Sequence, residues 1–363
     1  MTISGGSSAL LDSLRILAAF TVVADHACQQ WLTADNIVLE QFDNIAHAAV
    51  VVFFVLSGYL IAYTTTSNNR GPRQYAVARL SRLYSVVLPA LLLTGLIEIA
   101  VTHLDPALAA HYARGSSWPR YVLSLFFCNE VGWASAGPPI NSPLWSLSFE
   151  FWYYAIFGLW FYRGTGWKSL LLPIGACVVA GPKILVLIPI WLFGFLACRL
   201  PTPSFSTSKS WISVFTLLAV TGFAISYLPA APYPLGFKPL FFANRFVTDW
   251  FIGIIFSLAL WFLPAEGHFL KSEWVKLLRI TADLSFPLYV LHYPLLVLWR
   301  AIFGWQANNT LQMWQAAVVV SFLAILIGIF LENQRNNWVR FFWWATNYIN
   351  LQRVLLTEKM FKA

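Results

Sequence analysis

Two polar side chains with different chemistry stand in the first apolar stretch of the chain. Arg15 carries a permanent positive charge, whereas His26 can accept or donate a proton near neutral pH. On an α-helix their spacing falls about 20° from three whole turns, so both side chains share one face. Their separation along the helix axis is about 16 Å. Arg15 and His26 are therefore predicted to act at two points along one face, without touching each other.

Two later apolar segments also place polar groups on one helix face. Ser146 and Glu150 are four positions apart, and Tyr289 and His292 are three positions apart. A carboxylate within a membrane needs a partner or a wet cavity, so Glu150 is a candidate for acid–base chemistry. The alternative interpretation gives Glu150 a structural hydrogen bond and His292 a packing role.

Two further motifs lie between these segments. Arg79 and Arg82 are three positions apart on a helix that enters the membrane, and paired guanidinium groups suit the binding of phosphate. The alternative is the ordinary excess of basic residues beside a membrane span. Ser57 offers a hydroxyl group next to Gly58, and this glycine permits close approach of another helix.

The composition predicts a membrane protein. Of the 363 residues, 59% are hydrophobic and 10% are charged, whereas soluble proteins carry roughly 25% charged residues. The net charge of +8 does not indicate nucleic-acid binding, because the basic residues stand in short loops beside apolar segments. The four cysteines have no CxxC spacing, so neither a metal site nor a redox pair is expected.

The apolar segments predict an all-α, polytopic helical bundle of about ten transmembrane helices. A span needs about 20 residues to cross the hydrocarbon core. The predicted spans are 11–31, 44–63, 84–104, 144–163, 167–181, 184–200, 211–229, 247–264, 283–303 and 312–332. The fifth and sixth are short and divided at Gly181 and Pro182, and the apolar piece 119–128 is predicted to lie in a surface loop or to re-enter the membrane.

Ionisable groups in or near these spans are functional candidates, because charge is costly inside a bilayer. They are Arg15, His26, His47, Glu98, Glu150, Asp249, Asp283 and His292. Most of the 23 Lys and Arg residues fall on the side of the N-terminus, which predicts that both termini are cytoplasmic. Residues 1–333 are predicted to form a membrane domain, and residues 334–363 an amphipathic cytoplasmic tail that contacts membrane lipids.

Five motifs, in order, resemble those of the acyltransferase 3 family. They are Arg15 with His26, the FFVLSGYLI segment at 53–61, Arg79 with Arg82, the WSLSFE segment at 145–150, and Ser285-Phe286 with Tyr289 and His292. Together they run from residue 11 to about 330. Two positions depart from the family pattern, Asp25 before His26 and Phe151 after Glu150.

The resemblance implies an integral membrane enzyme, typically of the bacterial inner membrane. It implies transfer of an acyl group, most often acetyl, from acyl-CoA to a hydroxyl group of a saccharide such as an exopolysaccharide, O-antigen or lipid-linked sugar, without a metal. The residues expected to bind the donor are Arg15, Arg79 and Arg82. The expected catalytic residues are His26 as general base, with Glu150 and Ser146 orienting the base or the acceptor. Tyr289, His292 and Ser57 are assigned to support of the substrate or the oxyanion.

Other functions remain open at this stage. A transporter or permease would use Glu98, Glu150, Asp249 and His26 as a proton or solute path, and would be expected to show inverted repeats. A non-catalytic scaffold gives no reason for five polar motifs within the membrane. If the protein is a transferase, the chemical alternative to direct transfer is a covalent acyl-enzyme formed through Ser57 or Ser146.

Overall fold

The computed structural model describes residues 5–33, 37–67, 71–228, 240–265 and 272–361. Within these ranges the secondary structure is helical and contains no strand. The longer helices are α1 (Gly5–Trp31), α2 (Ile37–Ser67), α3 (Pro72–Leu104), α6 (Trp145–Phe161), α8 (Pro182–Arg199), α9 (Thr207–Tyr227), α10 (Phe246–Trp261), α12 (Ser285–Phe303), α13 (Thr310–Asn333) and α14 (Arg335–Phe361). The shorter elements are α4 (Pro106–Tyr112), α5 (Ser117–Leu125), α7 (Leu171–Ala180), α11 (Ser272–Asp283) and 3₁₀ turns at Ser142–Leu144, Trp167–Leu170 and Phe241–Ala243. The all-α class is confirmed.

Seven helical stretches in the described residues are long and apolar enough to cross a membrane. They are Gly5–Trp31, Asn44–Thr66, Pro72–Leu104, Pro182–Arg199, Thr207–Tyr227, Glu273–Phe303 and Thr310–Asn333. Trp167–Ala180 and Phe246–Trp261 are apolar but shorter. Each of the ten predicted spans overlaps a helix, with residue 229 outside the described residues. The count of ten and the cytoplasmic position of the termini remain predictions.

Helix α3 begins well before the apolar segment that predicts it. Pro72 occupies its first turn, where no backbone N–H group is needed, and Gly71 precedes it in an extended conformation. The helix therefore starts twelve residues ahead of the predicted span at 84. As a result, Arg79 and Arg82 lie one turn apart on a continuous helix that carries them into the bundle.

The boundary between α7 and α8 lies at Gly181, as the sequence predicts. Gly181 has a φ of +82°, which favours glycine, and Pro182 begins α8. A Cβ atom at Gly181 would lie 2.5 Å from the Cα atom of Gly132 in the loop before α6. This close contact is a second reason for a glycine at position 181. The backbone N–H of Gly132 donates to the carbonyl oxygen of Ala180 at 3.0 Å.

Helices α2 and α8 pack against each other through two glycines. A Cβ atom at Gly58 would lie 1.9 Å from the carbonyl oxygen of Trp191, and one at Gly194 would lie 1.9 Å from the carbonyl oxygen of Val55. Small residues allow this close backbone approach between membrane helices. The packing interpretation of Gly58 is therefore confirmed, and the contact fixes the neighbouring Ser57 on the wall of a cavity.

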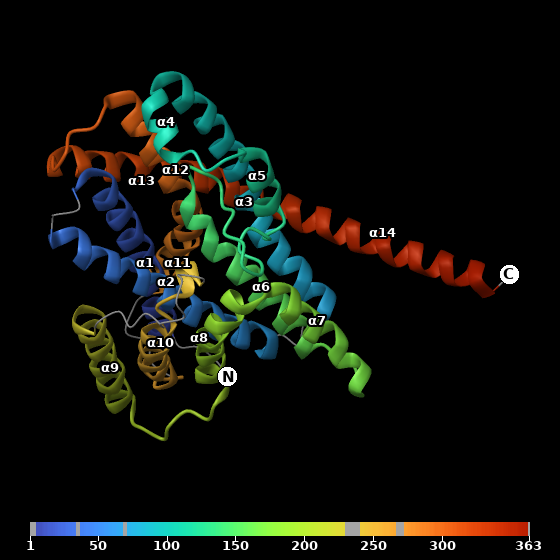
Figure 1. Cartoon of the computed structure of the whole chain (residues 1–363). Coiled ribbons are helices and arrows are strands. Elements are labelled where there is room, and N and C mark those ends of the chain that lie inside the picture. The colour runs from blue at the N-terminus through green and yellow to red at the C-terminus, as the bar shows by residue number, and fades with distance from the viewer. Residues whose placement is uncertain (1–4, 34–36, 68–70, 229–239, 266–271, 362–363) are drawn as a thin grey trace.

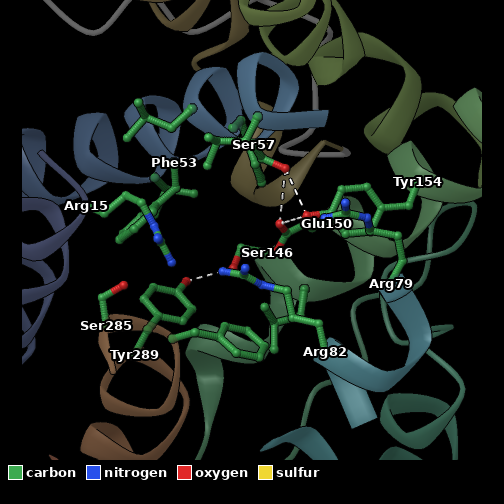
Figure 2. A pocket seen from close by; sticks show the side chains of 16 residues that line it. Arg15, Phe53, Ser57, Arg79, Arg82, Ser146, Glu150, Tyr154, Ser285 and Tyr289 are labelled. Atoms are coloured by element: carbon green, nitrogen blue, oxygen red, sulfur yellow. Dashed lines mark hydrogen bonds between the residues drawn. The ribbon is translucent and has the colours of Figure 1, made fainter. Parts of the chain in front are cut away.

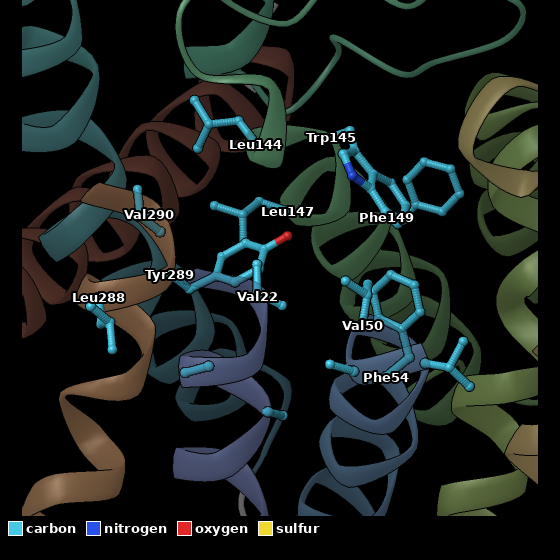
Figure 3. Packing of buried hydrophobic residues seen from close by; sticks show 14 of the residues in the cluster. Val22, Val50, Phe54, Leu144, Trp145, Leu147, Phe149, Leu288, Tyr289 and Val290 are labelled. Carbon is cyan, nitrogen blue, oxygen red and sulfur yellow. The ribbon is translucent and has the colours of Figure 1, made fainter. Parts of the chain in front are cut away.

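Helix α1 packs against α2, α11, α12 and α13. Helix α12 in turn packs against α1, α3 and α13. Buried apolar side chains from α1, α2, α6 and α12 lie together in the core, among them Val22, Val50, Leu147 and Tyr289 (Figure 3). This junction brings the polar motifs of distant segments together.

The segment between α5 and α6 is anchored to α8 by a buried ion pair. The Lys183 Nζ atom lies 2.6 Å from Glu130 Oε2, and the side chains are 0% and 1% exposed. Removing one partner would leave a buried charge uncompensated, which is strongly destabilising. The apolar piece at 119–128 corresponds mainly to α5, where the Tyr121 hydroxyl donates to Glu98 Oε2 at 2.6 Å on α3.

Helix α14 extends away from the bundle (Figure 1). It is joined to α3 by Arg73, which donates to Thr346 Oγ1 at 2.9 Å and places its guanidinium group 4.3 Å from the Trp343 ring centre. The predicted tail is thus a helix up to Phe361. Its contact with membrane lipids remains a prediction.

Candidate active site

A cavity at the crossing of α1, α2, α3, α6 and α12 contains three guanidinium groups (Figure 2). We call it the arginine cavity and define it by Arg15, Ser57, Arg79, Arg82, Ser146 and Glu150. Arg15 reaches it from α1, and Arg79 and Arg82 reach it from α3. The sequence predicted these three residues as one functional set, and the structure places them around the same space.

The guanidinium groups of the arginine cavity are incompletely paired. Arg15 lies 3.5 Å from Asp12 and 3.7 Å from Asp283, which is longer than a direct charge-assisted hydrogen bond. In the described part of the chain, neither Arg79 nor Arg82 has a carboxylate within 4.0 Å. The buried Arg79 Nε atom has no hydrogen-bond partner there either. Such a cluster favours an anion with several oxygen atoms.

Glu150 lies in the arginine cavity with hydroxyl groups around its carboxylate. Its Oε1 atom accepts hydrogen bonds from Ser57 Oγ, at 3.1 Å, and from the Tyr154 hydroxyl. Ser57 also lies 3.0 Å from the Tyr154 hydroxyl and accepts a hydrogen bond from Trp191 Nε1 at 3.2 Å. Glu150 thus accepts the hydrogen bonds that hold these hydroxyl groups on one wall of the arginine cavity. The carboxylate is not among the lining groups of the cavity that contains His26.

Ser146 and Tyr289 form a separate hydrogen-bonded pair between α6 and α12. Their hydroxyl oxygens are 2.7 Å apart, and the Tyr289 hydroxyl donates to the carbonyl oxygen of Pro143 at 3.1 Å. Ser146 Oγ also lies 3.3 Å from the Pro143 carbonyl oxygen, so the two hydroxyl groups and this acceptor form one network in which either hydroxyl can donate to the other. Both side chains are buried and line the arginine cavity.

A second cavity lies on the other side of Tyr289. We call it the histidine cavity and define it by Asp25, His26, Gln29, His47, Trp145 and Phe242. One wall is aromatic, because the rings of Trp145 and Phe242 stack with centroids 4.5 Å apart and an interplanar angle of 4°. Other lining groups are polar, with Gln29 donating to Asp25 Oδ2 at 2.8 Å.

His26 is held by His292 across the interface of α1 and α12. The Nδ1 atom of His26 lies 2.7 Å from Nε2 of His292, and Nδ1 of His292 lies 3.1 Å from the carbonyl oxygen of Leu288. That carbonyl can only accept, so the neutral His292 ring carries its proton on Nδ1 and accepts at Nε2. The His26 Nδ1 atom must then donate. Consequently the lone pair of His26 is on Nε2, where it can accept a proton.

His47, which also lines the histidine cavity, pairs with Asp249 of α10. Its Nε2 atom lies 3.0 Å and 3.1 Å from the two carboxylate oxygens of Asp249, whose side chain is 2% exposed. The sequence identified both residues as ionisable groups in or near spans but gave no reason to pair them. A carboxylate in an apolar helix was the available signal that Asp249 needs a partner.

The chain matches the profile of the acyltransferase 3 family, described as an acyltransferase domain, over residues 9–333. The chain belongs to this family. It is also similar to "Acyltransferase MdmB" of Streptomyces mycarofaciens, with 32% identity over 157 residues. The match covers 42% of this chain and 38% of that relative, so the chain spans well under half the length of that protein. No solved structure matches the chain.

Membership of the acyltransferase 3 family and the apolar helices indicate an integral membrane protein. All nine predicted site residues lie inside the family match. The structure gathers seven of them at the arginine cavity and places His26 and His292 together on the far side of Tyr289. Glu150 was expected to orient His26 or the acceptor, but the hydrogen-bond partner of His26 in the described residues is His292.

Proposed function

We propose that this acyltransferase moves an acyl group, most often acetyl, from acyl-CoA to a hydroxyl group of a saccharide. The observation that carries the proposal is the junction of a cavity rich in guanidinium groups with a cavity in which a histidine presents an unprotonated nitrogen. One suits the phosphates of a donor, and the other suits removal of a proton from an acceptor. Tyr289 lines both cavities.

The donor would bind through its phosphate groups at Arg79 and Arg82, with Arg15 near the path of the pantetheine arm. Paired guanidinium groups bind phosphate through several directed hydrogen bonds. The absence of close carboxylates beside Arg79 and Arg82 in the described residues leaves their charges available for an anionic ligand. The thioester would then point from the arginine cavity toward His26.

The acceptor hydroxyl would lose its proton to His26 Nε2 as its oxygen attacks the thioester carbon. The tetrahedral intermediate collapses when the carbon–sulfur bond breaks, and the leaving thiolate of CoA takes the proton from the imidazolium. The products are an ester and free CoA, with no net proton released. His292 acts as a positioning residue, because its Nε2 atom fixes His26 in the tautomer that the base requires.

The histidine cavity offers suitable contacts for a saccharide. The aromatic wall formed by Trp145 and Phe242 matches the apolar face of a sugar ring, and Asp25 with Gln29 presents hydrogen-bonding groups to its hydroxyls. A lipid-linked or polymeric saccharide could reach this cavity from the membrane surface. We place the enzyme in a bacterial inner membrane with cytoplasmic termini, where acyl-CoA is available, and with α14 at the lipid surface.

Direct transfer is favoured over a covalent acyl-enzyme. The hydrogen-bond partners of Ser57 are Glu150, Tyr154 and Trp191, and those of Ser146 are Tyr289 and Pro143. A nucleophilic serine needs an adjacent base to remove its proton, and the partners of Ser146 include none. Ser57 does donate to the Glu150 carboxylate, but the same oxygen also accepts from Tyr154, whereas the Nε2 lone pair of His26 is unshared with another protein group in the tautomer assigned above. Incubation with labelled acetyl-CoA followed by denaturation should therefore leave the protein without covalent label, whereas a hydroxylamine-sensitive label would contradict direct transfer.

The proposed function is tested with membranes that contain this protein in its native background. Radiolabelled acetyl-CoA is supplied, and label is followed into lipid-linked and polymeric saccharide. Wild-type membranes should transfer label, and the His26→Ala variant should not. His103→Ala changes an exposed histidine outside both cavities and serves as the matched control. Failure of wild-type transfer, together with solute flux in proteoliposomes without acyl-CoA, would favour the transporter alternative.

A further inference from the structure

Val50 and Tyr289 are the two residues that line both the arginine cavity and the histidine cavity in the described residues. Val50 projects from α2 and Tyr289 from α12, and their exposed fractions are 7% and 6%. We propose that these two side chains form the aperture through which the acyl end of the donor reaches His26, and so set the largest acyl group that the enzyme transfers. This inference rests on the proposed function.

The position of the aperture follows from where the reacting groups lie. The guanidinium groups line one cavity and His26 lines the other. A donor held at the arginines can meet the base only if its thioester crosses the boundary between the two spaces. Tyr289 stands beside the base, because its ring centroid is 6.0 Å from that of His292, which bonds to His26.

Tyr289 is held in place by three contacts. Its hydroxyl donates to the carbonyl oxygen of Pro143 at 3.1 Å and lies 2.7 Å from Ser146 Oγ. Its ring meets Phe53 edge-on, with centroids 5.9 Å apart and an interplanar angle of 68°. Figure 3 shows the ring close to Leu147 and Val22. A side chain restrained in this way presents a fixed limit to a passing group rather than a mobile one.

Val50 forms the opposite rim and is the simpler residue to change. It is β-branched on a helix, so its χ1 angle has little freedom and its methyl groups keep their positions. Removing them widens the aperture without altering a hydrogen bond or a charge. One methylene group in an apolar pocket changes discrimination between substrates by about 10–200-fold, so the change should be readily measured.

The test compares kcat/KM for butyryl-CoA and acetyl-CoA, with the same acceptor, in Val50→Ala and wild type. We expect the butyryl-to-acetyl ratio to rise by about 10-fold or more in Val50→Ala. Tyr289→Leu should raise the same ratio, because it removes bulk from the other side of the aperture. Val50→Ile adds a methylene group and should lower the ratio. The matched control is Val51→Ala, because Val51 is the next buried valine of α2 and lines neither cavity.

The outcomes separate the two claims. A wild type that transfers acetyl while Val50→Ala and Tyr289→Leu leave the ratio unchanged would overturn the aperture and leave the proposed function intact. An equal rise in Val51→Ala would also overturn it, because the effect would then reflect general loosening of α2. A wild type that transfers no acyl group from either donor would contradict the proposed function, and the aperture with it.

Discussion

The arginine cavity and the histidine cavity hold their polar groups in contrasting ways. The guanidinium groups of Arg79 and Arg82 have no close carboxylate among the described residues, and the nearest carboxylates of Arg15 are 3.5 and 3.7 Å away. His26 instead ends a chain of hydrogen bonds through His292 to a backbone carbonyl. One region keeps charge available for a ligand, and the other keeps a single nitrogen in one protonation state.

This difference matches the demands of binding and of proton transfer. A binding site gains affinity when the ligand supplies hydrogen-bond acceptors to charged groups that have no such partner in the protein, because charge-assisted hydrogen bonds are the strong ones. A base gains rate when its geometry and tautomer are fixed before the substrate arrives. Changes in the arginine cavity should therefore affect donor affinity, and changes in the histidine cavity should affect turnover.

The largest effect is expected from His26→Ala. Removing the base should lower kcat by about 10²–10⁴-fold, because general base catalysis contributes that range. The KM for acyl-CoA should stay within about threefold of wild type, since the arginine cavity is unchanged. Steady-state transfer of labelled acetyl groups measures both constants, with His103→Ala as control. A His26→Ala variant with near-normal kcat would remove the base from the account.

His292→Ala should have the next largest effect. Loss of its Nε2 acceptor frees the His26 ring and its tautomer, and misplacement of this kind costs about 10²-fold in rate. The kcat should fall and the donor KM should change little.

His292→Gln should recover part of the rate, because its amide oxygen can accept from His26 Nδ1. Tyr293→Phe keeps a ring edge-on to His26, at 5.1 Å between centroids in the wild type, and is the matched control. Equal losses in His292→Ala and His292→Gln would argue against positioning through an accepted hydrogen bond.

Arg82→Ala should act on the donor rather than on turnover. A hydrogen bond to a charged group contributes about 1.5–3 kcal/mol, and each 1.4 kcal/mol is tenfold in affinity, so the donor KM should rise about 10–100-fold. Arg82→Lys should restore part of the affinity but not the paired geometry. Arg163→Ala removes an exposed guanidinium outside both cavities and should leave the donor KM unchanged. An unchanged KM in Arg82→Ala would exclude Arg82 from donor binding.

Gly58→Ala should have the smallest effect on the chemistry but should reduce stability. Its new Cβ atom would meet the carbonyl oxygen of Trp191 at 1.9 Å, so α2 and α8 must separate, and overpacking costs about 1–3 kcal/mol. Thermal unfolding in detergent should show a lower midpoint. Gly222→Ala on α9 meets nothing within 4 Å and is the control. Equal midpoints for Gly58→Ala and wild type would show that the close approach is not required.

Much of the fold could be predicted from the sequence, because apolar segments of sufficient length fold as helices in a membrane. The ten predicted spans each overlap a helix, and Gly181 with Pro182 ends one helix and begins the next. Helix ends outside the apolar core could not be read in this way. Helix α3 extends to Pro72 because the helix continues through polar residues that hydropathy does not include.

The members of the site could be predicted more readily than their partners. Polar residues on one face of an apolar segment identify His26 and Glu150 as candidates, and the pairing of two arginines ahead of a span identifies Arg79 and Arg82. The partner of each depends on how distant helices cross, as with His26 and His292, 266 positions apart in the chain. For the same reason the sequence associated Glu150 with His26, whereas the crossing of α2 and α6 gives it Ser57 as a neighbour.

The central claim is that one cavity binds the donor and the other performs proton transfer. Equilibrium binding of CoA to the purified protein in detergent tests this claim most directly, using wild type, His26→Ala and the double variant Arg79→Ala with Arg82→Ala. The account predicts that His26→Ala binds CoA within about twofold of wild type and that the double variant binds at least about tenfold more weakly. Wild-type affinity in the double variant, or an equal loss in His26→Ala, would contradict it.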